Sequence, residues 1–455
     1  MSRRKNNSSI IILFLFALVA GGVLYLYNSS MFERNKPIVE LQNSGFWNLK
    51  KPLNLKINDD SGIKTYKVIL QSTKGEKTLY YEELLSPKQS ITLEVEPPRS
   101  AYAMKDKKVK IIVEAIDVSK WNFFNGNMIV KEFVVEIDKK RPQLNTITNS
   151  YKITKGGSAI VIFKAGDENL KDLYIQTNFG KKFKVEPFYK EGYYISLLAW
   201  PIREDSFRAT VVATDYAGNI SKSYIPLYLK QKNYRVSKIN LSDRFLKGKI
   251  AELAGEFTQT QGVDDLLEQF KIINEDVRAK NEDLIHKITS EVSDEMISNF
   301  KIKKMYPLRN AQVVASFGDH RKYYYDGEYI SESYHMGLDL ASNAMAAIKP
   351  QNGGKVVFAD FNGLYGNMPI INHGLGLYTL YGHCSSLVVN SGDEVTRGET
   401  IAHTGKSGYA MGDHLHFGVL VQGIEVRPAE WMDKTWIKLN ITNIIKSAKK
   451  IINKI

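Results

Sequence analysis

Cysteine is nearly absent from this chain, since Cys384 is the single one among 455 residues. An internal disulfide is therefore excluded, and no domain can rely on a covalent cross-link for its stability. Each domain has to bury an apolar core of its own. The apolar fraction of 43% and the charged fraction of 24% are ordinary for globular proteins. A chain of this length is expected to form about three domains, at roughly 150 residues each.

Acidic residues are fewer than basic ones, which gives a formal net charge of +13. A basic surface attracts polyanions such as nucleic acid, anionic lipid or an acidic cell-wall polymer. The sequence contains no recognisable nucleic-acid-binding motif, so we expect no nucleic-acid partner. Lipid and cell-wall polymer both stay open on charge alone.

One long apolar run lies near the N-terminus. Ile10–Tyr27 contains no charge and has the length of a helix that spans a bilayer. Arg3, Arg4 and Lys5 precede it and predict that residues 1–9 stay in the cytoplasm. A cleaved signal peptide is the alternative, but the run is long for one and no clear Ala-x-Ala site follows it. We predict a single-pass anchor in the cell membrane over residues 10–27, with the bulk of the chain on the exported, periplasmic or wall-facing side.

Residues 37–232 have the pattern of β structure. Runs rich in valine, isoleucine and aromatic residues are separated by turn residues. Leu53–Leu70 is similar to Ser158–Gln176, because each contains a strand-like run, an acidic turn and a second run. Two copies of about 100 residues predict two β-sandwich domains, over 37–140 and 141–232.

The second copy ends in Ala213-Thr-Asp-Tyr-Ala-Gly-Asn219, which resembles the ending of many bacterial immunoglobulin-like repeats. Such repeats imply a surface for protein partners. Their turns contain Asp59, Asp60, Asp167 and Asp215, which are potential calcium ligands. An aspartate in a turn more often accepts backbone N–H groups, and the spacing matches no EF-hand.

Residues 241–302 change to a helical pattern. Apolar residues recur at helical spacing from Val263 to Val277, and no proline occurs between residues 241 and 300. We predict two or three helices that form an arm. The arm either holds or covers the following domain, or it is a spacer packed on its neighbours.

The C-terminal third begins with a β-rich, glycine-rich region over residues 303–436, followed by a basic amphipathic helix over 437–455. That helix is expected either to lie on an anionic membrane or to pack on the protein. The predicted fold is multidomain and mainly β. It consists of an N-terminal transmembrane helix, two immunoglobulin-like β-sandwiches, a helical arm and a β-rich catalytic domain.

Histidine is scarce but concentrated, because seven of the eight lie between His320 and His416. Three short motifs stand out: His335-Met-Gly-Leu-Asp339, Tyr381-Gly-His383 and His414-Leu-His416. Imidazole and carboxylate are ordinary zinc ligands, and a catalytic zinc has three protein ligands and one open position. The motifs therefore predict a metal-dependent hydrolase with imidazoles left over for proton transfer.

The motifs H-x3-D, Y-x-H and H-x-H resemble those of the M23 family of zinc metallopeptidases, the lysostaphin- and LytM-type cell-wall endopeptidases. Their order and separations match the family. So do Ser316-Phe-Gly318 before the first motif, Gly392–Gly398 after the second and Thr404–Gly408 before the third. The resemblance covers residues 311–431 and implies an M23 (LytM-type) catalytic domain within residues 303–436.

The resemblance implies a zinc ion (Zn2+) as cofactor, held by His335, Asp339 and His416. Two imidazoles and one carboxylate leave such an ion net positive with one position open, where a water becomes a nucleophile near pH 7. His383 and His414 remain as catalytic histidines. One of them takes a proton from the water and the other stabilises the oxyanion. The sequence does not determine which histidine has which role. No H-E-x-x-H glutamate is present to act as base.

Other residues near the motifs have structural explanations. Strand alternation turns Cys384 away from the preceding histidine, which excludes a cysteine protease. His373 and His403 are expected to be structural. Tyr381 either lines the groove or belongs to the core, and an aromatic residue on a strand favours the core. His320 lies in the loop before the site, where a substrate contact is the alternative to a structural role.

These features predict a membrane-anchored zinc metalloendopeptidase that hydrolyses peptide cross-links of peptidoglycan in cell-wall remodelling. The family includes enzymes that cut a bond formed by D-alanine and enzymes that cut a glycine bridge. The D,D-endopeptidase type is our first choice. The alternative is a non-hydrolytic M23-like regulator that activates another cell-wall hydrolase, because some members have lost ligands. The presence of all five motif residues favours the enzyme.

Overall fold

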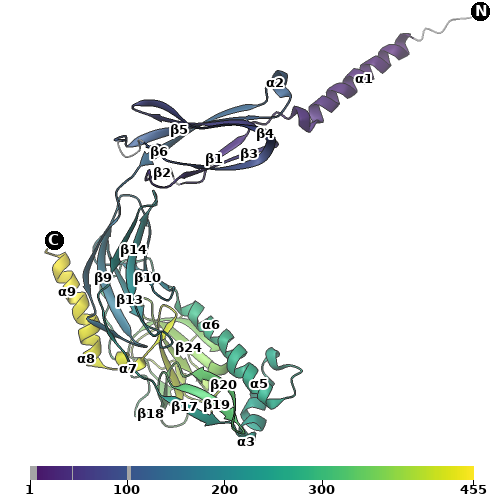
Figure 1. The fold of residues 1–455 in the computed structure, drawn as a ribbon. Coiled ribbons are helices and arrows are strands. Elements are labelled where there is room, and N and C mark those ends of the chain that lie inside the picture. Colours follow the sequence, from purple (N-terminus) through teal and green to yellow (C-terminus); the bar gives the residue numbers. More distant parts are fainter. Residues whose placement is uncertain (1–7, 44, 100–103, 455) are drawn as a thin grey trace, which may run out of the picture. The chain divides into compact units, whose positions relative to one another are not determined.

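The computed structural model describes residues 8–43, 45–99 and 104–454 (Figure 1). The basic flank Arg3, Arg4 and Lys5 lies outside the described residues. The chain divides into two compact units. Unit 1 comprises residues 1–142, 167–171 and 214–220, and unit 2 comprises residues 143–166, 172–213 and 221–455.

Unit 1 begins with an apolar helix, α1 (Ser8–Asn28). Its segment Ile10–Asn28 is not buried against other residues and is long and apolar enough to cross a bilayer. A signal sequence has the same properties. The predicted N-terminal apolar helix is confirmed, and its role as a retained anchor stays a prediction.

The rest of unit 1 forms a six-stranded sheet with the order β1-β3-β5-β6-β2, in which β4 also pairs with β3. The strands are β1 (Ile38–Leu41), β2 (Phe46–Trp47), β3 (Leu53–Ser72), β4 (Gly75–Val95), β5 (Lys108–Asp117) and β6 (Met128–Ile137). A short helical turn, α2 (Trp121–Phe124), links β5 to β6. Alternate residues of β3 and β5, such as Leu55, Ile57, Ile111 and Val113, are fully buried in one apolar core.

The acidic turn expected within Leu53–Leu70 does not end a strand. β3 continues through it, with shifts in the pairing register between Asn58 and Thr65. Asp59 Oδ1 accepts the backbone N–H groups of Ser61 and Gly62, each at 2.9 Å. The side chain therefore satisfies backbone groups that the irregular pairing leaves free, and the strand can pass through the turn.

The loose internal repeat is visible in its hydrogen bonds. Asp117 accepts the backbone N–H (2.7 Å) and side-chain Nδ2 (2.8 Å) of Asn127. Asp215 accepts the same two groups of Asn219, both at 2.8 Å. In both copies the aspartate carboxylate thus stabilises a turn by accepting N–H groups of an asparagine, as expected for aspartates at such positions.

Two four-stranded sheets, most of whose residues belong to the first part of unit 2, have apolar side chains that join one core around Phe163, Phe183 and Trp200. One sheet has the order β11 (Lys182–Phe183), β10 (Leu170–Thr177), β14 (Ala209–Asp215), β15 (Ile220–Tyr224). The other has the order β12 (Glu186–Pro187), β13 (Tyr193–Ala199), β9 (Ser158–Gly166), β7 (Gln143–Asn149). A parallel pair, β8 (Lys152–Thr154) and β16 (Tyr228–Lys230), accompanies them. A mainly β chain is confirmed, whereas the immunoglobulin-like assignment and the domain boundaries stay predictions.

The second part of unit 2 is built on an eight-stranded sheet. Its main path is β18 (Gln312–Ala315), β21 (Leu338–Ala341), β29 (Leu415–Val421), β25 (Leu377–Gly382), β24 (Asn367–Asn372), β23 (Gly354–Phe361) and β27 (Glu394–Val395), and β30 (Ile424–Val426) pairs with β29. Two smaller sheets flank it. They are β17 (Val236–Asn240), β19 (His320–Tyr325) and β20 (Glu328–Tyr334), and β22 (Ala347–Ile348), β28 (Ala402–His403) and β26 (Ser386–Leu387).

The predicted arm consists of two helical segments, each interrupted by a π-helical turn. The first joins α3 (Asp243–Phe245) to α4 (Ala251–Ala254), and the second joins α5 (Leu266–Ile272) to α6 (Arg278–Thr289). Helix α5 lies beside β20 (Figure 1). The apolar stripe of the arm is buried against the β19–β20 hairpin in a cluster that contains Leu246, Ile250, Phe270, Ile273, Val277 and Tyr323. The arm is therefore packed directly on the region that carries the histidines.

The C-terminal segment is helical and packs on the protein. It comprises α7 (Pro428–Trp431), α8 (Lys434–Ile437) and α9 (Asn443–Ile452), with a π-helical turn between the last two. Ile441, Ile445 and Ile452 are buried in the same core as the two four-stranded sheets, and α9 contacts β7 and β9 (Figure 1). Of the two expectations for this helix, the structure therefore contains the protein-packed one.

Candidate functional site

Two strands of the large sheet bring the first site residues together. β21 and β29 are antiparallel, and Asp339 is directly opposite His416. Directly paired residues point to the same face of a sheet, so both side chains face the same space. Leu415 and Phe417 point the other way and are fully buried, as strand alternation predicts. His335 lies in the segment just before β21 and completes the group.

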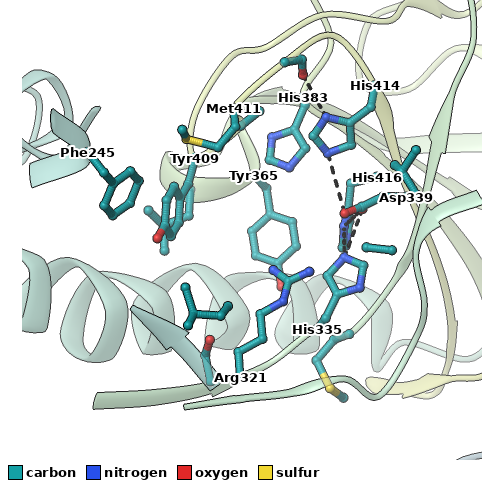
Figure 2. Close-up of a pocket in the computed structure, with 18 of the residues that line it drawn as sticks. Phe245, Arg321, His335, Asp339, Tyr365, His383, Tyr409, Met411, His414 and His416 are labelled. Atoms are coloured by element: carbon teal, nitrogen blue, oxygen red, sulfur yellow. Dashed lines mark hydrogen bonds and ion pairs between the residues drawn. The ribbon is translucent and has the colours of Figure 1, made fainter. Parts of the chain in front are cut away.

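His335, Asp339 and His416 form a tight triangle (Figure 2). His335 Nε2 lies 2.9 Å from Asp339 Oδ1 and 3.2 Å from His416 Nδ1, and the latter lies 2.9 Å from Asp339 Oδ1. Ligands about 2.0–2.1 Å from a tetrahedral zinc ion lie roughly 3.3 Å from one another. The three donor atoms therefore fit zinc in number, chemical type and spacing.

The surroundings of the triangle orient its donors. His335 Nδ1 lies 2.9 Å from the carbonyl oxygen of Ser316, so it carries a proton, and this contact directs Nε2 toward the triangle. All three triangle residues are buried. Burial alone would raise the pKa of the Asp339 carboxyl, but hydrogen bonds from His335 and His416 outweigh it and hold that pKa well below its usual range. Asp339 is thus a carboxylate, the form that binds a cation.

His383 and His414 lie beside the triangle, with ring centroids 4.9 Å apart. His383 follows β25 with a left-handed backbone (φ 64°), and its N–H donates to the carbonyl of Tyr365 at 2.8 Å. His414 immediately precedes β29, and its backbone forms an isolated antiparallel β-bridge with Gly405. Two loops of the sheet therefore place these imidazoles on the open side of the triangle.

Both of these imidazoles have one nitrogen committed to a backbone carbonyl. His383 Nδ1 lies 2.9 Å from Ser407 O, and His414 Nδ1 lies 2.8 Å from Gly412 O. In the neutral tautomer that these contacts select, Nε2 is unprotonated and can accept a proton. Burial, followed by the charges of the other two nearby histidines, lowers the pKa of His383 to about 3, so this imidazole is neutral at neutral pH. His414 Nε2 lies 3.7 Å from Asp339 Oδ2.

The five motif residues open into a cavity of about 660 Å3 (Figure 2). Aromatic and apolar side chains make much of its wall, including Tyr323, Tyr365, Tyr409 and Met411. The arm contributes Phe245 to this wall, together with Leu241, Ser242 and Arg278. The cavity is therefore bounded both by the arm and by the histidines.

Tyr365 is a cavity residue that sequence reasoning missed. Its ring is buried and lies edge-on to His416, with centroids 5.5 Å apart. Asn281 of the arm holds the loop that carries it, because Asn281 Oδ1 accepts the Leu364 N–H at 2.8 Å. Gly363 (φ 49°) has no room for a Cβ, which would lie 2.3 Å from Asn281 Oδ1. The glycines on both sides of Leu364 and Tyr365 were the one available signal for a tightly held loop.

The remaining residues singled out in the sequence do not line the cavity of the five motif residues. Tyr381 is buried against Phe417 in the core, and its hydroxyl accepts a hydrogen bond from Thr379. Cys384 is fully buried. His320 stacks on Tyr334, with centroids 4.3 Å apart.

Two further histidines have structural hydrogen bonds. His373 lies between the carbonyl of Gly353 and the hydroxyl of Thr379, at 2.8 Å from each. His403 Nδ1 lies 3.1 Å from the hydroxyl of Ser386. Neither residue lines the cavity of the five motif residues.

The family model of Peptidase family M23 matches residues 333–428. This range contains the triangle and both flanking histidines. Residues 333–428 are an M23 peptidase domain.

Several known proteins are similar to part of this chain. The peptidoglycan DD-endopeptidase ShyB of Vibrio cholerae is 33% identical over 129 residues, which are 28% of this chain and 29% of ShyB. The murein hydrolase activator EnvC of Escherichia coli is 32% identical over 98 residues, which are 22% of this chain and 23% of EnvC. The catalytic domain of lysostaphin from Staphylococcus simulans is 26% identical with a TM-score of 0.23, over 27% of this chain and 92% of that domain. The chain thus spans less than a third of the length of ShyB or EnvC.

Proposed function

We propose that this chain is a membrane-anchored zinc metalloendopeptidase that hydrolyses peptide cross-links in peptidoglycan. The observation that supports it most directly is the His335–Asp339–His416 triangle, which opens into a cavity flanked by two more imidazoles. Three donors and an open side are the arrangement of a catalytic zinc site rather than a structural one, which has four protein ligands.

The chain's own residues supply the other parts of a hydrolase. Zinc, when bound by the triangle, supplies Lewis-acid chemistry that activates water and polarises a carbonyl group. Nε2 of His383 or His414 is free to take a proton from the attacking water and to pass it to the leaving amine. The other imidazole, when protonated, donates a hydrogen bond to the oxygen that becomes negative during attack. Asp339 holds both triangle histidines in place through its Oδ1 atom.

Peptidoglycan is the substrate class that the comparisons support. ShyB is a peptidoglycan DD-endopeptidase by name, and it is 33% identical to this chain over 129 residues. A bond formed by D-alanine is therefore our proposed target. Aromatic side chains line the cavity. Aromatic rings pack well against the backbone and side chains of a bound peptide, so these walls suit a peptide substrate.

Helix α1 supports an exported location. A retained anchor with the basic residues before it in the cytoplasm would place the M23 domain on the side of the membrane where the wall is. The region between α1 and the M23 domain would then determine how far the enzyme reaches from the membrane and would offer surfaces to protein partners.

A second candidate function is activation of another cell-wall hydrolase without hydrolysis, since EnvC is such an activator by name. In that case the cavity would bind no zinc, or bind it without turnover. The five motif residues, all directed at one cavity, favour hydrolysis.

The test uses purified cell-wall sacculi and the chain from residue 29 onward, because α1 is not buried against the rest. We expect release of soluble fragments with newly freed amino groups, loss of this activity with a chelator, and recovery with zinc. Intact sacculi after incubation with zinc-loaded protein would contradict the enzyme. Stimulation of a partner hydrolase in the same assay would then support the activator.

A further inference from the structure

Two arginines line the cavity beside the triangle, and the mechanism above uses neither of them. Arg321 belongs to β19 and Arg278 to α6 of the arm. Both side chains are partly buried. A guanidinium group in the wall of this cavity adds positive charge, which attracts anionic groups. The presence of two such groups therefore suggests that they bind an anion.

Arg321 faces the reaction centre. Along β19, Arg321 and Tyr323 line the cavity, and Lys322 between them does not. Figure 2 shows the Arg321 guanidinium directed into the space next to Tyr365 and His335. Strand alternation therefore presents this side chain to any peptide held at the triangle.

The nearest carboxylate leaves much of the Arg321 guanidinium available. Arg321 Nε lies 3.6 Å from Asp319 Oδ2, which is longer than a hydrogen bond. Asp319 also accepts a 2.7 Å hydrogen bond from the hydroxyl of Ser237. A guanidinium has five N–H donors in a planar fork, so the two terminal nitrogens can bind a second, planar anion.

Arg278 is held by neutral groups. Its Nε donates to Asn274 O at 3.1 Å and its Nη2 to Asn274 Oδ1 at 3.0 Å. Its guanidinium carbon lies 6.0 Å from the centre of the Tyr409 ring. Burial raises the pKa of the Tyr409 hydroxyl, and the charges of Arg278 and Arg321 oppose that rise, which places both cations near the same wall of the cavity.

We propose that Arg321 is a specificity-determining residue that binds a free carboxylate of the substrate peptide next to the scissile amide, with Arg278 as a second cation of the same subsite. The inference rests on the proposed function and deepens it, because it selects peptides by charge. Carboxylate and guanidinium match in shape and form two parallel hydrogen bonds. Two sources supply such a carboxylate: the C-terminus of a linear peptide one residue beyond the scissile bond, and the α-carboxylate of a branched cross-linking residue.

The first experiment compares hydrolysis of matched peptides by the zinc-loaded chain. One pair is a linear peptide with a free C-terminal carboxylate and its C-terminal amide. The other pair is a branched cross-linked peptide with a free α-carboxylate beside the scissile bond and its amidated form. We expect kcat/KM for the acid of at least one pair to exceed that for its amide about tenfold, in keeping with a charge-assisted bidentate contact. The pair that shows the preference identifies the source.

Substitutions assign the preference to its residue. Arg321→Gln should bring the acid-to-amide ratio close to one, and Arg321→Lys should retain part of the preference because it keeps the charge but loses the fork. Lys322→Gln is the matched control, since it removes the same charge from the same strand at a position that does not line the cavity, and it should leave the ratio unchanged. An unchanged ratio in zinc-loaded Arg321→Gln would overturn the proposal.

A binding measurement separates this proposal from the proposed function. Calorimetric titration of the same peptides into chelator-treated protein removes the metal as a competing carboxylate ligand. Tighter binding of the acid by the parent, which is lost in Arg321→Gln and reduced in Arg321→Lys, supports the subsite even if no peptide is hydrolysed. Equal binding of acid and amide by the parent, together with equal hydrolysis, would overturn the subsite and leave the peptidase in place.

Discussion

The His335–Asp339–His416 triangle holds two imidazole nitrogens 3.2 Å apart around one carboxylate oxygen. Such close packing of donor atoms is stable when a cation or shared protons lie among them. Replacing one ligand should therefore affect metal affinity first and activity as a consequence.

We predict that His416→Ala has almost no bound zinc and no measurable hydrolysis of sacculi. Only two protein ligands would remain, and an open zinc site needs three. Metal analysis after gel filtration provides the measurement. His403→Ala is the matched control, because that imidazole contacts the hydroxyl of Ser386 outside the cavity. Full zinc occupancy in His416→Ala would show that the ligand assignment is wrong.

The two flanking histidines should behave differently from the ligands. His383→Ala and His414→Ala are expected to retain zinc but to lose activity by about 100-fold or more, the usual contribution of general acid–base catalysis. Their kcat on a cross-linked peptide, normalised to zinc content, gives the comparison. A variant that cleaves at the parental rate would remove that histidine from the mechanism.

Polar contacts add to the apolar cluster that holds the helical arm to the β19–β20 hairpin and to the loop that carries Tyr365. Asn274 donates to the hydroxyl of Ser331 at 2.8 Å, and Asn281 holds the loop that carries Tyr365. Phe245 projects from α3 into the cavity and stacks on Tyr409, with centroids 6.0 Å apart. An element in this position can limit access of a large substrate.

We expect Phe245→Ala to speed hydrolysis of intact sacculi more than hydrolysis of a short peptide, because it widens the cavity on the arm side without touching a ligand. Leu284→Ala, at an exposed position of α6, is the control and should change neither rate. Equal rates for the parent and Phe245→Ala, with equal zinc content and thermal stability, would favour an arm that is only a spacer.

A buried carboxyl group, that of Glu430, connects α7 to β9 within unit 2. Glu430 Oε2 accepts the N–H of Ser158 in β9 at 2.9 Å, and its Oε1 lies 3.3 Å from Arg427 Nη1. Burial raises the pKa of Glu430 from 4.5 to about 7, although Ser158 and Arg427 oppose that rise. The folded state therefore favours the protonated form of this carboxyl.

The unfolded chain loses the Glu430 proton at a lower pH than the folded chain does, so the free energy of unfolding should fall as the pH rises from about 4.5 to 7. Above pH 7 the carboxyl is ionised in both states, and Glu430 should cause no further change in that free energy. The shift corresponds to about 3 kcal/mol. Glu430→Gln has no titrating carboxyl, so the difference in unfolding free energy between parent and variant should change by that amount across the window. Denaturant unfolding at several pH values measures it, with the exposed Glu394→Gln as control. A pH-independent difference would contradict the argument.

Retention of α1 in the mature protein is a prediction about the whole chain. We expect the full-length chain in the membrane fraction, with residues after Asn28 accessible to protease from the exported side, because the apolar helix is long enough to span a bilayer. N-terminal sequencing of the mature protein provides the check. A soluble exported chain that starts near residue 28 would identify a signal peptide.

Motif spacing was sufficient to predict which five residues meet at one cavity. The five motif residues lie around one cavity, Leu415 and Phe417 point into the core, and Cys384 is buried away from the site. Strand geometry explains Leu415 and Phe417, because a strand turns successive side chains to opposite faces. It does not explain Cys384, because β25 ends at Gly382 and His383 has a left-handed backbone. The order and separations of the three motifs were the basis of the resemblance to M23 peptidases.

Tertiary packing decided the rest. The amphipathic pattern of the arm and of α9 required an apolar partner but did not specify which one, and the structure buries them on the β19–β20 hairpin and on β7 and β9. Tyr365, Arg278 and Arg321 belong to the cavity because distant segments meet there. Apolar burial is non-directional, so a sequence pattern states that a face is covered, and only the folded chain shows what covers it.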